Sequence, residues 1–129
     1  MSYVVDASAL IALLRDEPGA DQVEAALADA DGPAHLSTVN LAEVHQALGP
    51  DLPVGLVGAP EGAPLIVAVS FSIEHARIAA ALRPATRELG LSLADRACLA
   101  LARAAALPAL TADRAWARAD VGVDVRVIR

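Results

Sequence analysis

Four acidic side chains stand out in the sequence because of where they fall relative to apolar segments. Asp6 and Asp113 each follow a short apolar run of the kind that forms a buried strand, and Asp95 lies near the start of an apolar helical run. Glu43 lies inside another helical run. Removing a carboxylate from water costs free energy unless something pairs with it. These acids therefore indicate a site that binds a cation.

A helix cap is a simpler explanation for three of the four acids. Asp6 or Ser8 could cap a helix that begins at once, and Asp113 could cap a short helix after it. Ser92 and Asp95 have the spacing of a capping box, with Asp in place of the usual Glu. Taken singly, each of these acids is explained by capping at least as well as by catalysis.

Glu43 has no such explanation. Val39 and Ala47 lie four residues before and after it, so its carboxylate falls on an apolar helix face. Its partner is either an Arg, since Arg96 and Arg114 adjoin two of the acids, or a metal ion. Several converging acids repel one another. Mg²⁺ or Mn²⁺ would relieve that repulsion because both prefer carboxylate oxygens, and the sequence has no Cys or His cluster for a softer metal.

Short β-branched runs alternate with longer helical runs, which predicts an α/β fold with a central parallel sheet covered on both faces. We expect about five short strands, at residues 3–6, 34–37, 65–69, 108–112 and 123–128. We expect helices at 7–14, 19–30, 38–48, 72–89 with a break or kink at Pro84, 92–107 and 113–119. Residues 49–64 contain four Pro and four Gly and predict a loop, with one helical turn at most. Ligands of such sheets bind at the carboxyl ends of the strands, where Asp6 and Asp113 are expected.

The length and composition predict one domain over residues 1–129. The chain is 56% hydrophobic, and no apolar run reaches the length of a membrane span. We find no signal peptide pattern. The single cysteine, Cys98, lies in an apolar helical run and is expected to be a buried thiol. These features favour a cytoplasmic protein.

The charges are divided unequally along the chain, whose net charge is −6. Residues 1–64 contain ten acids and one basic residue, Arg15, whereas residues 65–129 contain nine Arg and six acids. A nucleic-acid partner is therefore expected on the C-terminal half.

Four segments together resemble a known family. VVDASAL, NLAEV, LSLADRACLALA and LTADRAW resemble the PIN-domain ribonucleases, and more narrowly the VapC-like toxins of VapBC-type toxin–antitoxin pairs. The resemblance covers nearly the whole chain and implies a three-layer α/β/α fold. It also implies a metal-dependent endoribonuclease that hydrolyses RNA phosphodiesters with Mg²⁺ or Mn²⁺. The acidic quartet would be Asp6, Glu43, Asp95 and Asp113, supported by the polar residues Ser8, Asn40 and Thr111.

Within this family reading, Asp6 and Asp95 are expected as the main metal ligands. Asp113 and Glu43 would complete the site, and Glu43 would also orient or deprotonate the attacking water. The hydroxyl groups of Ser8 and Thr111 would hold these carboxylates, or water bound to the metal, through hydrogen bonds.

The basic residues nearest the acids are the expected RNA contacts. Arg96, Arg114 and Arg118 follow the acidic motifs closely and are predicted to reach flanking phosphates. Arg83 and Arg87, one helical turn apart, are a second candidate pair. Only 2% of the residues are aromatic, which argues against a platform for stacking bases.

The resemblance implies protein partners as well. Toxins of this type are homodimers and are silenced by a small antitoxin. Residues 49–64 depart from the family pattern, in which more helix and more basic residues are common, so the groove and dimer contacts there are not predicted.

Three other functions are compatible with an α/β fold that has acids at its strand ends. A phosphoacceptor receiver domain needs a Lys near its acidic pocket, and this chain has none. A phosphatase with an Asp nucleophile would have D-x-D after the first strand, where the third residue here is Ser8. A non-catalytic PIN-like module that binds metal or RNA remains as the alternative, although all four acids are present.

Overall fold

The computed structural model describes all residues 1–129 and contains one sheet of six strands in the order β3-β4-β2-β1-β5-β6. Every pair of neighbouring strands is parallel. The strands are β1 (Val4–Val5), β2 (Ala34–Ser37), β3 (Val57–Gly58), β4 (Ile66–Val69), β5 (Ala109–Thr111) and β6 (Val125–Val127). Because the strands are parallel, their carboxyl ends share one edge of the sheet.

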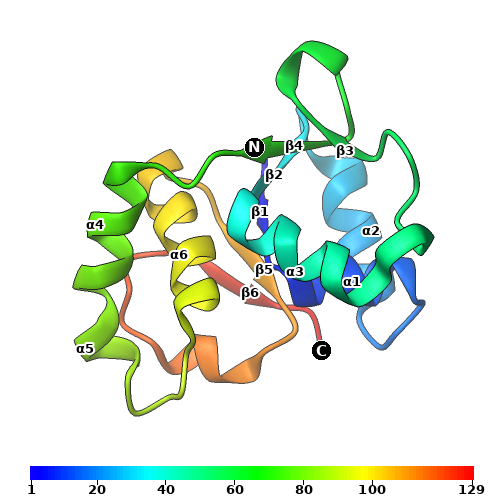
Figure 1. Ribbon diagram of the computed structural model, residues 1–129. Helices are drawn as coiled ribbons and strands as arrows, with labels where there is room; N and C mark the ends of the chain where they lie inside the picture. Colours follow the sequence, from blue (N-terminus) through cyan, green and yellow to red (C-terminus); the bar gives the residue numbers. More distant parts are fainter.

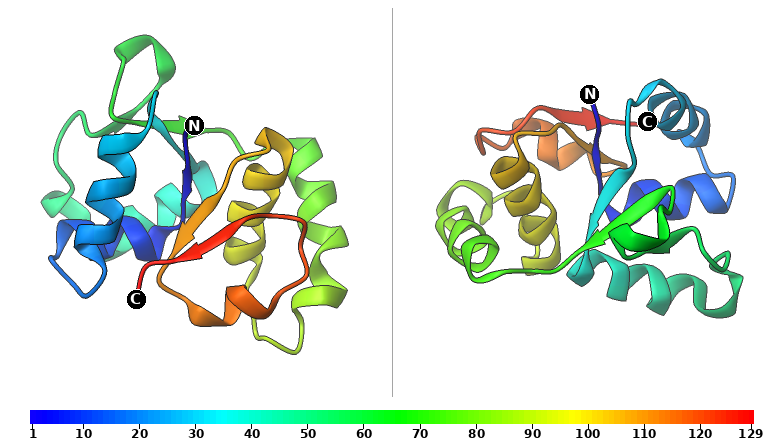
Figure 2. Two further views of the ribbon diagram at one scale, coloured as in Figure 1. Left: turned by 180° about the vertical axis from the view of Figure 1, so that it is seen from behind. Right: turned by 90° about the horizontal axis from the view of Figure 1, so that it is seen from above.

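The helices form a layer on each side of this sheet (Figures 1 and 2). One layer contains α1 (Ala7–Leu14), α2 (Ala20–Asp29) and α3 (Thr38–Leu48); the other contains α4 (Ile73–Ala81), α5 (Arg83–Thr86) and α6 (Leu93–Ala105). Short 3₁₀ helices are η1 (Gly49–Asp51), η2 (Pro60–Gly62) and η3 (Arg114–Arg118). The predicted three-layer α/β/α fold is confirmed.

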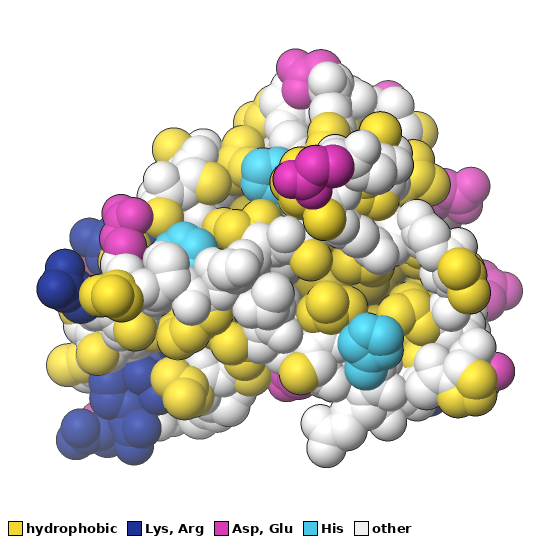
Figure 3. Space-filling view, turned by 45° about the horizontal axis from the view of Figure 1, so that its top comes forward, with side chains coloured by type: hydrophobic (Ala, Val, Ile, Leu, Met, Phe, Trp, Pro, Cys, Tyr) yellow, Lys and Arg dark blue, Asp and Glu magenta, His cyan; other side chains and the backbone are white.

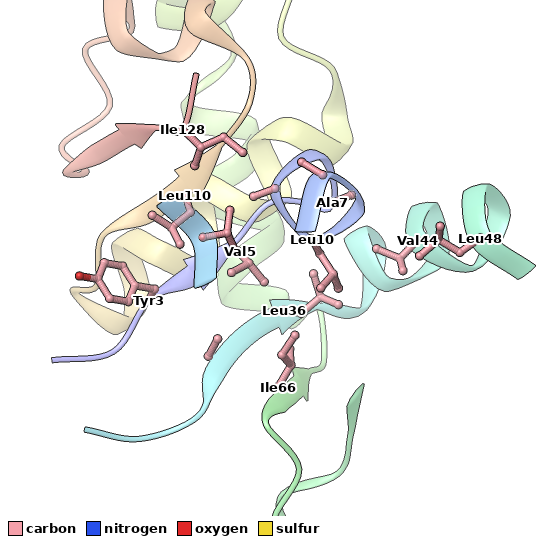
Figure 4. Close-up of a cluster of buried hydrophobic side chains, with 14 residues drawn as sticks. Tyr3, Val5, Ala7, Leu10, Leu36, Val44, Leu48, Ile66, Leu110 and Ile128 are labelled. Atoms are coloured by element: carbon pink, nitrogen blue, oxygen red, sulfur yellow. The ribbon is translucent and has the colours of Figure 1, made fainter. Parts of the chain in front are cut away.

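Side chains of the strands point alternately to the two faces of the sheet, so the core consists of two clusters, one on each face. Val5 and Leu110 pack with α1, α2 and α3 on one face, where Figure 4 shows them beside Leu10 and Leu36. Val4, directly before Val5, packs instead with α6 on the other face. Successive strand residues point to opposite faces of a sheet, so two consecutive valines are enough to join both layers.

Residues 49–64 are not only a loop. Val57 and Gly58 form the edge strand β3 against Ile66 and Val67, so the sheet has six strands rather than about five. A strand of two residues is too short to show the alternation of apolar and polar residues by which strands are predicted. It is recognised only by its pairing with β4.

Pro84 breaks the helix expected over 72–89. Helix α4 ends at Ala81, and α5 is a separate short helix with Pro84 in its first turn, where the missing N–H costs nothing. The helix expected over 113–119 is the 3₁₀ helix η3. None of the helices combines the length and apolar character needed to cross a membrane.

Candidate functional site

Asp6 lies directly after β1, and its carboxylate is hydrogen-bonded to two hydroxyl groups, one in α1 and one in β5, rather than to the backbone of its own helix. Its Oδ2 accepts hydrogen bonds from Ser8 Oγ at 2.6 Å and from Thr111 Oγ1 at 3.0 Å. Although Asp6 is the N-cap residue of α1, its side chain makes no capping hydrogen bond. Capping therefore does not explain this acid, whose exposed fraction is only 4%.

Two hydroxyl groups connect Asp6 to the end of β5. Ser8 Oγ accepts a hydrogen bond from the backbone N–H of Ala112, and Thr111 Oγ1 accepts one from the backbone N–H of Asp113. Each hydroxyl thus accepts a hydrogen bond from a backbone N–H after or at the end of β5 and donates one to Asp6. Thr111 and Ser8 therefore hold the Asp6 carboxylate in place.

The charges of two other acids affect the pKa of Asp6. The pKa of Asp6 is raised to about 6, chiefly by burial and also by the negative charges of Asp95 and Glu43, while the hydrogen bonds from Ser8 and Thr111 oppose the rise. None of these three acids forms an ion pair. The structure therefore brings Asp6, Asp95 and Glu43 together without a cationic side chain to balance them.

Glu43 is held by Asn40, one turn earlier on α3. Asn40 Nδ2 donates to Glu43 Oε2 and to the carbonyl oxygen of Ala94, both at 3.0 Å. The Asn40 side chain is completely buried, and its Oδ1 has no hydrogen-bond partner. Asn40 therefore joins α3 to the first turn of α6, next to Asp95.

Replacing Asn40 by Ala is expected to lower the free energy of unfolding by about 2 kcal/mol, because the half-buried carbonyl oxygen of Ala94 and the carboxylate of Glu43 both lose their donor. Urea titration followed by circular dichroism measures this change. Gln46→Ala on the exposed side of the same helix is the control, and it should change stability little. Equal effects of the two substitutions would contradict the role given to Asn40.

Asp95 is both a cap and a member of the acidic group. Ser92 Oγ accepts from the backbone N–H of Asp95 at 3.1 Å, and Asp95 Oδ2 accepts from the backbone N–H of Ser92 at 2.8 Å. This is the predicted capping box. It fixes the rotamer of Asp95 while Oδ1 makes no hydrogen bond, so the cap does not exclude a ligand role.

Asp113 lies at the margin of the group. Its side chain is exposed, and its Oδ1 accepts from the backbone N–H of Ala115 at 2.9 Å, which caps η3. Its charge is not among the causes that shift the pKa of Asp6. The structure thus places three acids together and Asp113 beside them, linked through Thr111.

The donor chemistry of this group suits a hard divalent cation. All the candidate ligands are carboxylate oxygens, and no Arg or Lys balances their charge. As the side chains stand, however, no set of three or more Asp, Glu, His or Cys residues is arranged to hold a metal ion. The chemistry fits Mg²⁺ or Mn²⁺, and the acids interact through their charges rather than in a closed ligand cage.

The predicted RNA contacts are placed differently from one another. Arg96 is buried, and its Nη1 donates to the carbonyl oxygen of Ala79 at 2.8 Å, so it joins α6 to α4. This corrects the expectation that Arg96 reaches flanking phosphates. Arg114 and Arg118 are exposed on η3, directly after Asp113.

Sequence reasoning missed the position of Cys98. Its thiol is fully buried, as expected, but burial and the charges of Asp6, Asp95 and Glu43 all raise its pKa. Cys98 therefore lies within reach of the charges of these three acids. The signal was its spacing of three residues from Asp95, which puts both on one face of α6.

Comparisons with known proteins agree with this description. A family model described as PIN domain matches residues 3–122. Comparison with the curated proteins gives no match.

Solved structures with the same fold include three from bacterial toxin–antitoxin systems. VapBC2 from Rickettsia felis, bound to a DNA fragment from its promoter, has a TM-score of 0.71 with 14% identity, covering 100% of both chains. A toxin–antitoxin complex from Klebsiella pneumoniae has a TM-score of 0.70 with 21% identity, covering 98% of both chains. VapC20 from Mycobacterium tuberculosis, a toxin that cleaves the sarcin–ricin loop, has a TM-score of 0.70 with 17% identity, covering 96% of this chain and 98% of the other. Since the family model spans nearly the whole chain, the protein belongs to the PIN domain family.

Proposed function

We propose that the protein is a metal-dependent endoribonuclease and the toxin of a type II toxin–antitoxin pair, with residues 1–129 forming a single nuclease domain. One observation carries the proposal. The Asp6 carboxylate is buried at the end of β1, the charges of Asp95 and Glu43 raise its pKa, and no cationic side chain pairs with it. Membership of the PIN domain family supports this reading.

The ion, Mg²⁺ or Mn²⁺, would be held chiefly by Asp6 and Asp95, with Glu43 and Asp113 completing the set. When bound, it supplies Lewis-acid stabilisation of charge at the phosphate and lowers the pKa of water. Ser8 and Thr111 donate to Asp6 Oδ2 and leave Oδ1 open, which favours the ionised carboxylate.

Glu43 is the base in this proposal. Asn40 occupies Glu43 Oε2, which leaves Oε1 to accept a proton from the attacking water. Because Asn40 is itself anchored to the start of α6, the position of Glu43 is fixed relative to Asp95.

The protein partners follow from the structural relatives. The structures from Rickettsia felis and Klebsiella pneumoniae are toxin–antitoxin complexes. We accordingly propose a small antitoxin as the partner of this chain, and a homodimer as its state. The substrate is RNA.

RNA cleavage by the purified protein tests this function. Incubation of total RNA with Mg²⁺ or Mn²⁺, followed by mapping of new 5′ ends, should give cuts at discrete sites with 5′-phosphate ends. Chelation by EDTA should stop them, and added Mn²⁺ should restore them. Cleavage that continues in EDTA would contradict the proposal.

A non-catalytic module that binds metal or RNA is the second candidate. It is favoured by one observation: Asp95 and Asp113 both serve as helix caps, and no three acids are arranged as ligands of one ion. Binding of Mn²⁺ and RNA without any cleavage would support this function in place of the first.

A further inference from the structure

Four exposed arginines lie in or next to two short segments, α5 and η3. Figure 3 shows basic side chains at the end formed by α4 and α5, with an acidic side chain beside them, whereas the rest of the face in view carries acidic but no basic side chains. Arg83 and Arg87 lie in and directly after α5, and Arg114 and Arg118 lie in η3; all four are exposed. We name these four residues the arginine flank. None of them forms an ion pair with an acidic side chain, and of the four only Arg114 makes a side-chain hydrogen bond, from its Nε to the backbone oxygen of Arg129 at 3.0 Å.

A buried apolar cluster holds the two arginine pairs together. Leu82 beside α5, Leu91 before α6 and Trp116 in η3 belong to the same cluster. Arg83 directly follows Leu82, and Arg114 and Arg118 lie two residues on each side of Trp116. Figures 1 and 2 show η3 and the turn before α6 at the same end of the molecule.

This end is also where two of the acids lie. The turn from α5 into α6 is closed by backbone hydrogen bonds from Gly90 to Arg87 and from Leu91 to Thr86. The capping box that positions Asp95 comes directly after it. Asp113 lies directly before Arg114. The arginine flank thus borders the acidic group on the side of α6 and η3.

The other border of the acidic group, formed by α1 and α3, has no comparable charge. The only basic residue of residues 1–64 is Arg15, and its Nη2 already donates to the carbonyl oxygen of Ala47 at 2.7 Å. The other charged residues of this half are ten acids, Asp6 and Glu43 among them, and negative charge repels phosphate. Cationic contacts with a bound strand are available on one border alone.

We propose that the arginine flank binds the phosphates of RNA on one side of the cleaved bond, so that one monomer holds its substrate asymmetrically. This inference rests on the proposed function, since RNA is taken as the ligand. Exposed guanidinium groups bind phosphate oxygens through charge-assisted, often bidentate hydrogen bonds. The three aromatic residues of the chain offer no exposed stacking platform near η3, because Trp116 is buried. The contacts are therefore independent of base sequence.

Binding of a fluorescein-labelled single-stranded RNA oligonucleotide, followed by fluorescence anisotropy over a range of salt concentrations, tests the inference. All variants are made in an Asp6→Asn background and measured in EDTA, so that the RNA stays intact. Each lost phosphate contact lowers the salt slope by about 0.7, which is about fivefold in affinity at ~0.1 M salt. We expect that loss for Arg87→Gln, and about 25-fold for Arg83→Gln with Arg87→Gln.

Two further variants sharpen the result. Arg103→Gln removes the same charge from an exposed residue at the opposite end of α6 and should leave the affinity unchanged. Glu88→Gln, next to Arg87, removes a repelling charge and should strengthen binding. Circular dichroism melting curves verify that each variant is folded.

The inference is overturned if Arg103→Gln weakens binding as much as Arg87→Gln, or if neither does. The experiments distinguish a failure of this inference from a failure of the proposed function. If the wild-type protein cuts RNA but the flank variants bind normally, only this inference is wrong. If the flank variants lose affinity as described but the wild-type protein cuts no RNA, the inference stands and the nuclease function is wrong.

Discussion

Replacing Asp6 by Asn is expected to lower the kcat/KM for RNA cleavage by about a thousandfold, which corresponds to a loss of about 4 kcal/mol of transition-state stabilisation. The amide keeps the shape of the carboxylate, and its oxygen can still accept the hydrogen bonds from Ser8 and Thr111. It removes the negative charge that a divalent ion requires. The fold should therefore survive while the activity is lost.

Single-turnover cleavage of RNA at saturating Mn²⁺ measures this effect. Asp51→Asn removes the same charge from an exposed residue that makes no side-chain hydrogen bond, so its activity should equal that of the wild type. If Asp6→Asn retained more than about a tenth of the wild-type rate, a loss of only about 1.4 kcal/mol, Asp6 would not be a metal ligand.

The metal-free protein is expected to become less stable as the pH rises from 4 to 7. Asp6 has a pKa of about 6 in the folded protein against an ordinary value of 3.8, because burial disfavours its ionised form. The folded state therefore holds this proton more tightly than the unfolded chain. The contribution to stability is complete below the ordinary pKa and is lost as the pH rises through about 6; it amounts to about 3 kcal/mol.

Urea unfolding in EDTA at several pH values measures this change. Asp6→Asn cannot ionise, so its stability should lack the decrease and should exceed that of the wild type at pH 7 by up to about 3 kcal/mol. Added Mn²⁺ should stabilise the wild type at pH 7 and not the variant. A wild-type protein whose stability rises over this pH range, in step with the variant, would contradict the burial of a charged Asp6.

The strand ends were predictable because the sequence signals are local. Val4, Val5 and Asp6 form an apolar pair followed by a carboxylate. This pattern is visible in the sequence without knowledge of which distant residues contact it. The same is true of the capping box at Ser92, whose two hydrogen bonds join residues three apart. Parallel pairing then brings these local features to one edge of the sheet.

What could not be predicted depends on long-range packing. Arg96 is next to Asp95 in sequence, but its burial is decided by α4, which covers that face of α6. The bond from Asn40 to Ala94 spans 54 residues, so no spacing reveals it. Strand β3 likewise exists only through its pairing with β4.

The capping explanation shows where reasoning from single residues ends. From the sequence, helix capping explained Asp6 and Asp95 equally well. In the structure, the Asp95 side chain makes a capping hydrogen bond and the Asp6 side chain does not. The Asp6 carboxylate is instead held by the hydroxyl groups of Ser8 and of Thr111, and the second of these lies 105 residues away.

Direct titration of the protein with Mn²⁺, with calorimetry at pH 6 in buffers of different protonation enthalpy, tests the central claim that Asp6 and its neighbours form a metal site. The account predicts that the wild type binds Mn²⁺ and releases a proton as it does so, because Asp6 is partly protonated at this pH and must ionise to bind. Asp6→Asn should bind far more weakly and release no proton. Equal binding by the wild type and the variant would contradict the claim and place any metal elsewhere on the protein.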